Sequence, residues 1–349
     1  AFAFLERLVG TPSVSGEEAA AAEVFADGAR SLGFEVEIDQ VGNAIATRRA
    51  IGERRRQIVL LGHIDTVPGE IPVRVEDGVL HGRGAVDAKG PLVALLVGAA
   101  RAELTEGVEV VVVAAVGEEA SESIGAKAIR DRYRPDACII GEPSGWDGVT
   151  LGYKGRLVVE ATCRRSLAHT AGPDGSARDA LLRWWTEATA HAAKVSEPAE
   201  RAFDTLQATV HNWRSLDDWQ TDGAEMRCGF RLPPGVNPRE LFDLLRAFAG
   251  EGIELDLTGE ETAHATTRDD PVVRALSAAI RAEGGRPRPK LKTGTADLNV
   301  VGPAWGCPIA AYGPGDSSLD HTPEERVSDQ EFTMTLRVVR VALQTFSNT

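Results

Sequence analysis

The sequence predicts an α/β protein in which a mostly parallel sheet, with helices on both faces, is interrupted by a smaller ferredoxin-like α+β domain. Runs of aliphatic residues alternate with helical segments in the first half of the chain, which is typical of buried parallel strands. After Gly152 the pattern changes to alternating apolar and polar residues. Helix and buried-strand alternation returns from Asp270. The 349 residues fit about two domains at roughly 150 residues each.

The individual elements follow from these patterns. In the first half we expect a helix that ends at Gly33, capped by Ser15 with Glu18 in a capping box. A second helix is expected over 88–104, and buried strands over 58–61, 108–116 and 138–141. In the middle, segments near 157–163, 177–193, 206–210, 224–232, 242–248 and 253–257 read as strand, helix, two strands, helix and strand. A last helix is expected from Asp329 to about Phe346.

Composition excludes several classes of function. Lys and Arg total 38 and Asp and Glu total 52, so the net charge is −14. A duplex-DNA or anionic-membrane binder usually has a basic excess, so we expect neither partner. The longest uncharged apolar stretch covers nine residues, 92–100, whereas a bilayer span needs about 20. Four widely spaced cysteines and no signal-peptide pattern at the N-terminus favour a cytoplasmic protein with reduced thiols.

Metal-competent side chains follow the predicted buried strands. His63 and Asp65 follow the first, Glu118 and Glu119 the second and Glu142 the third. Asp87, at a predicted helix start, and His321 lie in loops that could reach the same place. In open α/β sheets ligands bind at the carboxyl ends of the strands. Each of these groups alone is commonly structural; their joint placement is what predicts a site.

Imidazoles and carboxylates without a thiolate suit zinc, cobalt or manganese. With two histidines, a pair of metals needs a shared carboxylate, and such a bridged pair, about 4 Å apart, serves hydrolysis. One carboxylate must stay off the metals as a proton shuttle, and the adjacent Glu118 and Glu119 could divide these two tasks. A nucleotide-dependent enzyme is disfavoured because the glycine loop at 82–87 is incomplete, with Asp at position 87.

The ordered set of motifs resembles the M20 family of co-catalytic metallopeptidases along essentially the whole chain. The motifs are GHIDTVP at 62–68, GRGAVDAKG at 82–90, GEE at 117–119, GEPS at 141–144 and DHTPE at 320–324. The resemblance implies a di-metal catalytic domain over 1–153 and 262–349, and an inserted lid and dimerisation domain over 154–261. It also implies a homodimer formed through the lid.

The resemblance also implies roles for individual residues. One Zn²⁺, or Co²⁺ or Mn²⁺ in its place, would take His63 and Glu142, and the other would take Glu119 and His321. Asp87 would bridge the two metals. Asp65 would orient His63, and Glu118 would be the general base.

The predicted lid adds further candidates. His169, in SLAHTAGP at 166–173, would help to stabilise the oxyanion, in its own subunit or the partner's. Arg231, in FRLP at 230–233, would hold a substrate carboxylate; an ordinary surface arginine remains the alternative. Lys292, Thr293 and Gly294 are further candidates for contact with the substrate.

Two stretches narrow the choice within the family. KLKTGTADLN at 290–299 and AYGPGDSSLDH at 311–321 look most like the short M20 enzymes of carrier-protein lysine biosynthesis. Those enzymes release lysine, and sometimes ornithine, from the C-terminal glutamate side chain of a small acidic carrier. The alternatives are an acetylornithine deacetylase, a succinyl-diaminopimelate desuccinylase, a carboxypeptidase, or a catalytically inactive metal-binding homologue.

An acidic enzyme acting on an acidic carrier needs a local basic surface, because the net charges oppose encounter. Ordinary solvated surface charge is the alternative reading for each basic residue. The candidates for the basic surface are Lys154, Arg156, Arg164, Arg165, Lys290 and Lys292.

Overall fold

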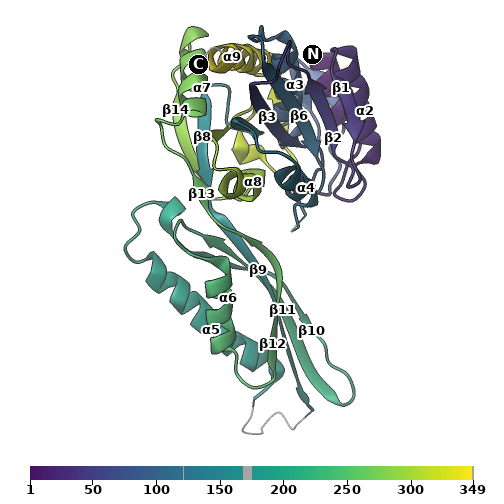
Figure 1. Cartoon of the computed structure of the whole chain (residues 1–349). Helices are drawn as coiled ribbons and strands as arrows, with labels where there is room; N and C mark the ends of the chain where they lie inside the picture. The colour runs from purple at the N-terminus through teal and green to yellow at the C-terminus, as the bar shows by residue number, and fades with distance from the viewer. Residues whose placement is uncertain (121, 168–174, 348–349) are drawn as a thin grey trace. The chain divides into compact units, whose positions relative to one another are not determined.

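The computed structural model describes residues 1–120, 122–167 and 175–347. The chain divides into two compact units (Figure 1). The first comprises Ala1–Gly152, Ala265–Leu291 and Ala296–Thr349, and the second Tyr153–His264 with Lys292–Thr295. Each unit has its own hydrophobic core.

The first unit is built on a mixed sheet whose central strands are parallel. The strand order is β1-β2-β6-β3-β7-β15-β8-β13, with β14 beside β8. β3 is parallel to both β6 and β7, and β7 is parallel to β15. The strands are β1 (Glu35–Ile38), β2 (Ala44–Arg48), β3 (Arg56–His63), β6 (Val108–Ala115), β7 (Ala137–Gly141), β8 (Gly148–Tyr153), β13 (His264–Ala265), β14 (Arg288–Lys292) and β15 (Ile309–Ala311).

The central strands form because most of their residues are aliphatic. All eight residues of β6 are buried, as are seven of the eight in β3, as expected for strands covered on both faces. The predicted mostly parallel α/β architecture is therefore confirmed. The antiparallel strands β1 and β2, at one end of the sheet, were not predicted.

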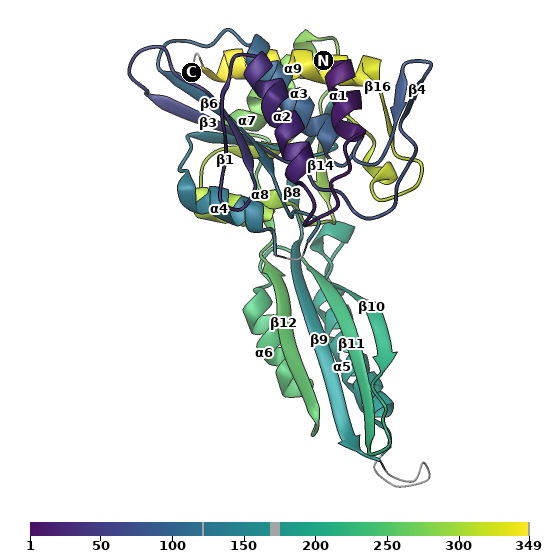
Figure 2. The ribbon, with the colours of Figure 1, turned by 90° about the vertical axis from the view of Figure 1, so that its right-hand side faces the viewer.

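Helices cover both faces of this sheet (Figure 2). One face carries α1, α2, α3, α7 and α9, and the other α4 and α8. A separate three-stranded sheet joins β4 (Arg74–Glu76), β5 (Val79–His81) and β16 (Arg326–Ser328). The helices are α1 (Phe2–Val9), α2 (Ala19–Ser31), α3 (Lys89–Arg101), α4 (Ile124–Arg132), α7 (Pro271–Ala282), α8 (Asp297–Trp305) and α9 (Asp329–Ser347).

Two glycines let α3 lie close against the central strands. A Cβ on Gly62 would lie 3.3 Å from the Cβ of Leu92, and one on Gly141 would lie 2.9 Å from a methyl carbon of Leu95. Gly62 and Gly141 are paired across β3 and β7. Gly62 immediately precedes His63, and Gly141 immediately precedes Glu142. The close packing of α3 therefore holds the backbone next to these two candidate metal ligands.

The second unit is a four-stranded antiparallel sheet with two helices on one face. The strand order is β10-β11-β9-β12, and α5 and α6 pack on it. Ser176 caps α5 in a capping box with Asp179, and the Asn237 side chain caps α6. The elements are β9 (Gly155–Ser166), α5 (Ala177–Ser196), a 3₁₀ turn (Ala202–Asp204), β10 (Gln207–Ser215), β11 (Thr221–Leu232), α6 (Pro238–Phe248) and β12 (Ile253–Glu261). This is the predicted element order.

Among the helices that the structure describes, none combines the length and apolar composition that crossing a bilayer requires.

Candidate metal centre

The ends of three adjacent parallel strands bring the first group of polar side chains together. His63 is the last residue of β3, Glu142 directly follows β7, and Glu118 and Glu119 follow β6. The register places His63 opposite Ala115 of β6 and Gly62 opposite Gly141 of β7. The carboxyl ends of these strands therefore meet at one edge of the sheet.

Asp87 lies between the two predicted histidines. It sits in the connection from β5 to α3, and its two carboxylate oxygens face different imidazoles. Oδ1 is 3.2 Å from Nε2 of His63, and Oδ2 is 3.1 Å from Nε2 of His321. Burial would raise the pKa of Asp87, but its hydrogen bonds to His321 and His63 outweigh burial and lower that pKa.

Each histidine also has a second carboxylate. Nε2 of His63 lies 3.8 Å from Oε1 of Glu142, and Nε2 of His321 lies 3.0 Å from Oε1 of Glu119. His321 has a φ of 62°, which is uncommon outside glycine and typical of functional loops. Hydrogen bonds to Asp87 and Glu119 raise the pKa of His321 to about 10.

The donor atoms form overlapping groups suited to divalent metals. His63, Asp87 and Glu142 offer ligand atoms within 4.8 Å of one another, and so do Asp87, Glu119 and His321. Asp87 belongs to both groups. Five carboxylates surround two imidazoles when Asp65 and Glu118 are included, and bound cations would neutralise this concentration of negative charge. The nitrogen and oxygen donors fit zinc, cobalt or manganese.

Glu118 lies beside these groups and has a strongly shifted proton affinity. Burial raises the pKa of Glu118 well above its usual value, and the carboxylates of Glu142 and Glu119 raise it further against the opposing charge of His63. Its side chain, with those of His63 and Glu119, forms a third cluster of donor atoms within 4.8 Å. A carboxylate with raised pKa next to a metal centre can take up and release a proton.

Asp65 organises the backbone of the site. Its carboxylate accepts hydrogen bonds from the backbone N–H groups of Glu118 at 3.1 Å and Glu119 at 3.0 Å. It also lies 3.4 Å from Nδ1 of His63. The Ser15 hydroxyl donates to Asp65 at 2.7 Å.

The predicted capping box at Ser15 is therefore wrong. α2 begins at Ala19 without a side-chain cap, and the Ser15 hydroxyl bonds to Asp65 instead of to the helix.

Sequence reasoning missed the residue that supports the Asp87 loop. Glu325 is fully buried, and its Oε1 accepts the backbone N–H groups of Gly84, Val86 and Asp87, each at 2.9 Å. Its Oε2 pairs with Arg83 at 2.9 Å. Glu325 directly follows the DHTPE motif. Because these contacts span about 240 residues of sequence, no local pattern indicates them.

The predicted substrate-binding residues lie in the second unit. Arg231 is exposed on β11 and donates to the hydroxyl of Thr295 at 2.8 Å. The Lys292 ammonium lies 5.6 Å from the ring centre of Tyr153. Thr293 and Gly294 belong to the same short segment, 292–295. His169 lies outside the described residues.

One candidate for a basic surface is wrong. Lys154 is buried, and its ammonium donates to carbonyl groups of Ala202 and Thr205 and to the side chain of Gln207. It therefore cannot meet a partner protein at the surface. Arg164 is exposed, Arg165 is half-buried, and Lys290 donates to the Ser144 carbonyl.

Comparison with known proteins decides the family. Residues 59–345 match the model of peptidase family M20/M25/M40. The chain belongs to the M20 peptidase family. It is a metal-dependent hydrolase of amide bonds, and the predicted family and enzyme class are confirmed.

Two curated relatives are similar to this chain along most of their length. A protein of Deinococcus radiodurans named [LysW]-lysine hydrolase is 44% identical over 347 residues, covering 97% of this chain and 95% of that protein. A putative [LysW]-lysine/[LysW]-ornithine hydrolase of Thermococcus kodakarensis is 41% identical over 338 residues, covering 96% and 89%.

Solved structures share the M20 fold. An M20 family metallo-carboxypeptidase of Sulfolobus solfataricus superposes with a TM-score of 0.82 at 17% identity, covering 99% of this chain and 98% of that one. Aminopeptidase PepT of Bacillus cereus gives a TM-score of 0.76 at 19% identity, covering 98% and 96%. At these identities the likeness concerns the fold alone.

Proposed function

We propose that this M20 enzyme releases lysine or ornithine from the C-terminal glutamate side chain of a small acidic amino-group carrier protein. The names of the relatives, together with their nearly complete coverage of this chain, support the substrate. The observation that carries the hydrolytic chemistry is Asp87, whose two oxygens face His63 and His321. A reaction of amino-acid biosynthesis would take place in the cytoplasm.

The proposed metal ligands follow the two donor groups. His63 and Glu142 would hold one Zn²⁺, Glu119 and His321 the other, and Asp87 would hold both. Co²⁺ or Mn²⁺ could substitute. When bound, the metals would supply Lewis acidity for the amide carbonyl and a water molecule of lowered pKa.

The remaining steps use the chain's own groups. The Glu118 carboxylate would accept a proton from the attacking water as its oxygen bonds to the carbonyl carbon. Glu118 would then give this proton to the nitrogen as the C–N bond breaks, so that a carboxylic acid and an amine leave. Asp65 would keep Glu118 and Glu119 in place through their backbone N–H groups.

We assign supporting roles to the inserted domain. In this proposal 1–153 and 262–349 form the catalytic domain, and 154–261 forms a lid through which two subunits pair. Arg231 would hold a substrate carboxylate, with Lys292, Thr293 and Gly294 nearby in the chain, and His169 would donate to the developing oxyanion. Guanidinium groups suit bidentate contact with carboxylates.

A turnover panel with excess zinc or cobalt tests the substrate. It compares carrier–lysine and carrier–ornithine adducts with acetylornithine, succinyl-diaminopimelate and simple dipeptides. We expect kcat/KM for a carrier adduct to exceed the others by at least about tenfold, which corresponds to about 1.4 kcal/mol of transition-state binding. Preference for acetylornithine or succinyl-diaminopimelate would replace the carrier in the proposal. Bound metal without any turnover would support an inactive homologue.

A further inference from the structure

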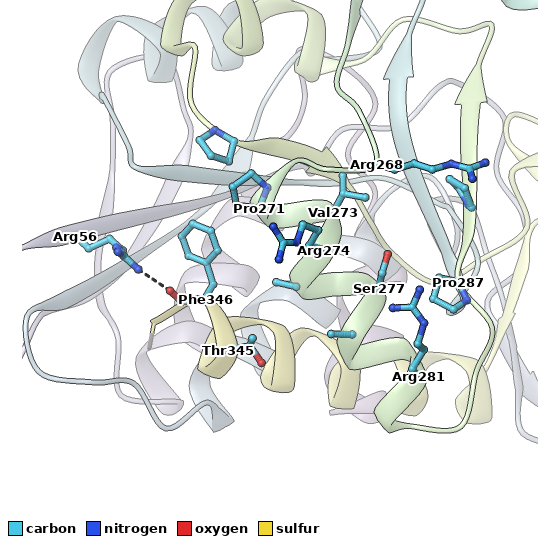
Figure 3. Close-up of a pocket in the computed structure, with 14 residues that line it drawn as sticks. Arg56, Arg268, Pro271, Val273, Arg274, Ser277, Arg281, Pro287, Thr345 and Phe346 are labelled. Atoms are coloured by element: carbon cyan, nitrogen blue, oxygen red, sulfur yellow. Dashed lines mark hydrogen bonds between the residues drawn. The ribbon is translucent and has the colours of Figure 1, made fainter. Parts of the chain in front are cut away.

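The first unit contains a groove whose charged side chains are opposite in sign to the carboxylates of the metal centre. It encloses about 810 Å³ and is lined by four arginines, Arg56, Arg268, Arg274 and Arg281 (Figure 3). We call it the arginine groove. Its volume falls in the range of small-molecule sites, about 300–1,000 Å³. Its positive lining contrasts with the net charge of −14 of the whole chain.

Three of these arginines have no acidic partner among the described residues. Among the described residues, the side chains of Arg268, Arg274 and Arg281 have no carboxylate within 4 Å and no hydrogen-bond partner. Other surface arginines hold an acid, such as Arg178 with Asp217 and Arg201 with Asp204. Like charges gathered without counter-charges repel one another, and an anion bound among them would relieve that repulsion.

The fourth arginine forms a fixed end of the groove. Arg56 donates to the Phe346 carbonyl at 2.6 Å, and its guanidinium lies 5.4 Å from the centre of the Phe346 ring. Figure 3 shows this pair across the groove from Arg281. Arg56 therefore forms part of the wall, and the arginines without an acidic partner in the described part of the chain are Arg268, Arg274 and Arg281.

The geometry favours an anion with several charges. Arg274 and Arg281 are seven residues apart on α7, which places them on one face and about 10 Å apart along the axis. Ser277 lies between them on that face and offers a hydroxyl. Separated guanidiniums bind linked anionic groups better than a single small ion.

Proline residues in the walls of the groove offer no backbone N–H groups to a bound anion. Pro271, Pro287, Pro289 and Pro308 line the groove, and proline has a fixed φ and no N–H donor. Recognition of charge therefore falls to the arginine side chains. Val273 and Ala275 add apolar surface for a carbon skeleton.

The groove lies away from the metal centre. Arg56 begins β3 and His63 ends it, which separates them by about 23 Å at 3.3 Å per residue. Pro308 likewise directly precedes β15. The groove thus opens at the amino ends of the strands, whereas the metal candidates cluster at the carboxyl ends. A small ligand in the groove could not touch the reacting bond.

We propose that the arginine groove binds a small polyanion, a molecule with two or more phosphate or carboxylate groups, at a site separate from the metal centre. This inference does not depend on the substrate proposed above.

Calorimetric titration of the metal-loaded full chain tests the proposal. The probes are pyrophosphate, citrate, inorganic phosphate and hexaglutamate, each at low ionic strength. We expect pyrophosphate or citrate to bind with a Kd below about 1 mM, and inorganic phosphate at least tenfold more weakly. Whether pyrophosphate or citrate binds more tightly tells a phosphate ligand from a carboxylate ligand.

Matched variants locate the binding. In the double variant Arg274→Ala/Arg281→Ala, the Kd should rise at least about tenfold. Arg340→Ala removes an exposed arginine of α9 that does not line the groove and should leave the Kd unchanged. Polyanions also bind metals, so His321→Ala is included; binding at the groove should survive it.

Three results would overturn the proposal: no binding of pyrophosphate or citrate below about 1 mM, an equal Kd in the double variant and the wild type, or binding of hexaglutamate alone. The last result would instead identify a contact with an acidic protein segment. The thermal unfolding midpoint of each variant is measured alongside, and since all three substituted arginines are exposed, the fold should be retained.

Discussion

The Asp65 carboxylate accepts the backbone N–H of Glu119 at 3.0 Å, a hydrogen bond that joins the ends of β3 and β6. The same carboxylate accepts the N–H of Glu118. One buried side chain thus positions both a proposed metal ligand and the proposed base.

Asp65→Asn should weaken the site without unfolding the protein. An amide has one acceptor oxygen where the carboxylate has two, so one of the N–H bonds from Glu118 and Glu119 is lost. We expect metal affinity or kcat to fall by about 10–100-fold, measured by metal titration and steady-state kinetics. Ser15→Ala, which removes one donor to Asp65, is the milder comparison. Wild-type values in Asp65→Asn would show that Asp65 does not position these groups.

Glu118→Gln should separate metal binding from catalysis. The amide keeps the size of the side chain but cannot accept the proton from water, so kcat should fall by about 10²–10⁴-fold. Metal content by mass spectrometry should equal that of the wild type. Loss of metal together with activity would instead make Glu118 a ligand. Glu119→Gln is the matched comparison and should lose metal.

Glu325→Gln should destabilise the first unit through the Asp87 loop. The amide cannot pair with Arg83, and breaking such a buried pair costs about 3 kcal/mol. Chemical denaturation measures the change in unfolding free energy. Glu324→Gln alters the neighbouring exposed glutamate and should change the free energy of unfolding by less than about 0.5 kcal/mol. Equal effects at both positions would contradict the role of Glu325.

Lys154 predicts a specific pH dependence of stability. Burial, and secondarily the charge of Arg231, lowers the pKa of Lys154 to about 8 from 10.5. Between these values the unfolded chain binds more protons, so stability rises with pH. Below about pH 8 both states are charged and the contribution is constant. The unfolding free energy of the wild type relative to Lys154→Met should therefore rise from about pH 8 to 10.5. A difference that stays flat or falls over this range would show that folding does not lower the pKa of Lys154.

Charge reversal at Arg164 and Arg165 tests how a carrier approaches the second unit. Arg164→Glu/Arg165→Glu should raise KM for the carrier adduct, by about tenfold at low salt, and leave small-substrate turnover unchanged. Arg239→Glu/Arg246→Glu makes the same charge change on α6 and should have less effect. An unchanged KM at low salt would remove Arg164 and Arg165 from the proposal.

The sequence predicted those parts of the structure that depend on local patterns. The aliphatic runs identified β3, β6 and β7, and the polar residues at their ends converge at one edge of the sheet. Ser15 was misassigned because its hydroxyl bonds to a residue 50 positions away rather than to its own helix. Lys154 was misassigned because sequence does not show that four acceptor atoms surround its ammonium. The arginine groove could not be predicted because its four arginines are spread from position 56 to 281.

Gly62 and Gly141 carry no functional side chain, yet there is little room at either position for a larger residue. A methyl group at Gly141 would come within 3.2 Å of the Cα of Gly62 and 2.9 Å of Leu95 on α3. To make room, the Leu95 side chain would have to turn aside and β3 would have to shift at Gly62. A substitution that never meets the substrate would thus disturb His63 and Glu142, which directly follow these glycines, so sequence drift at these two positions is limited by the geometry of the proposed metal ligands.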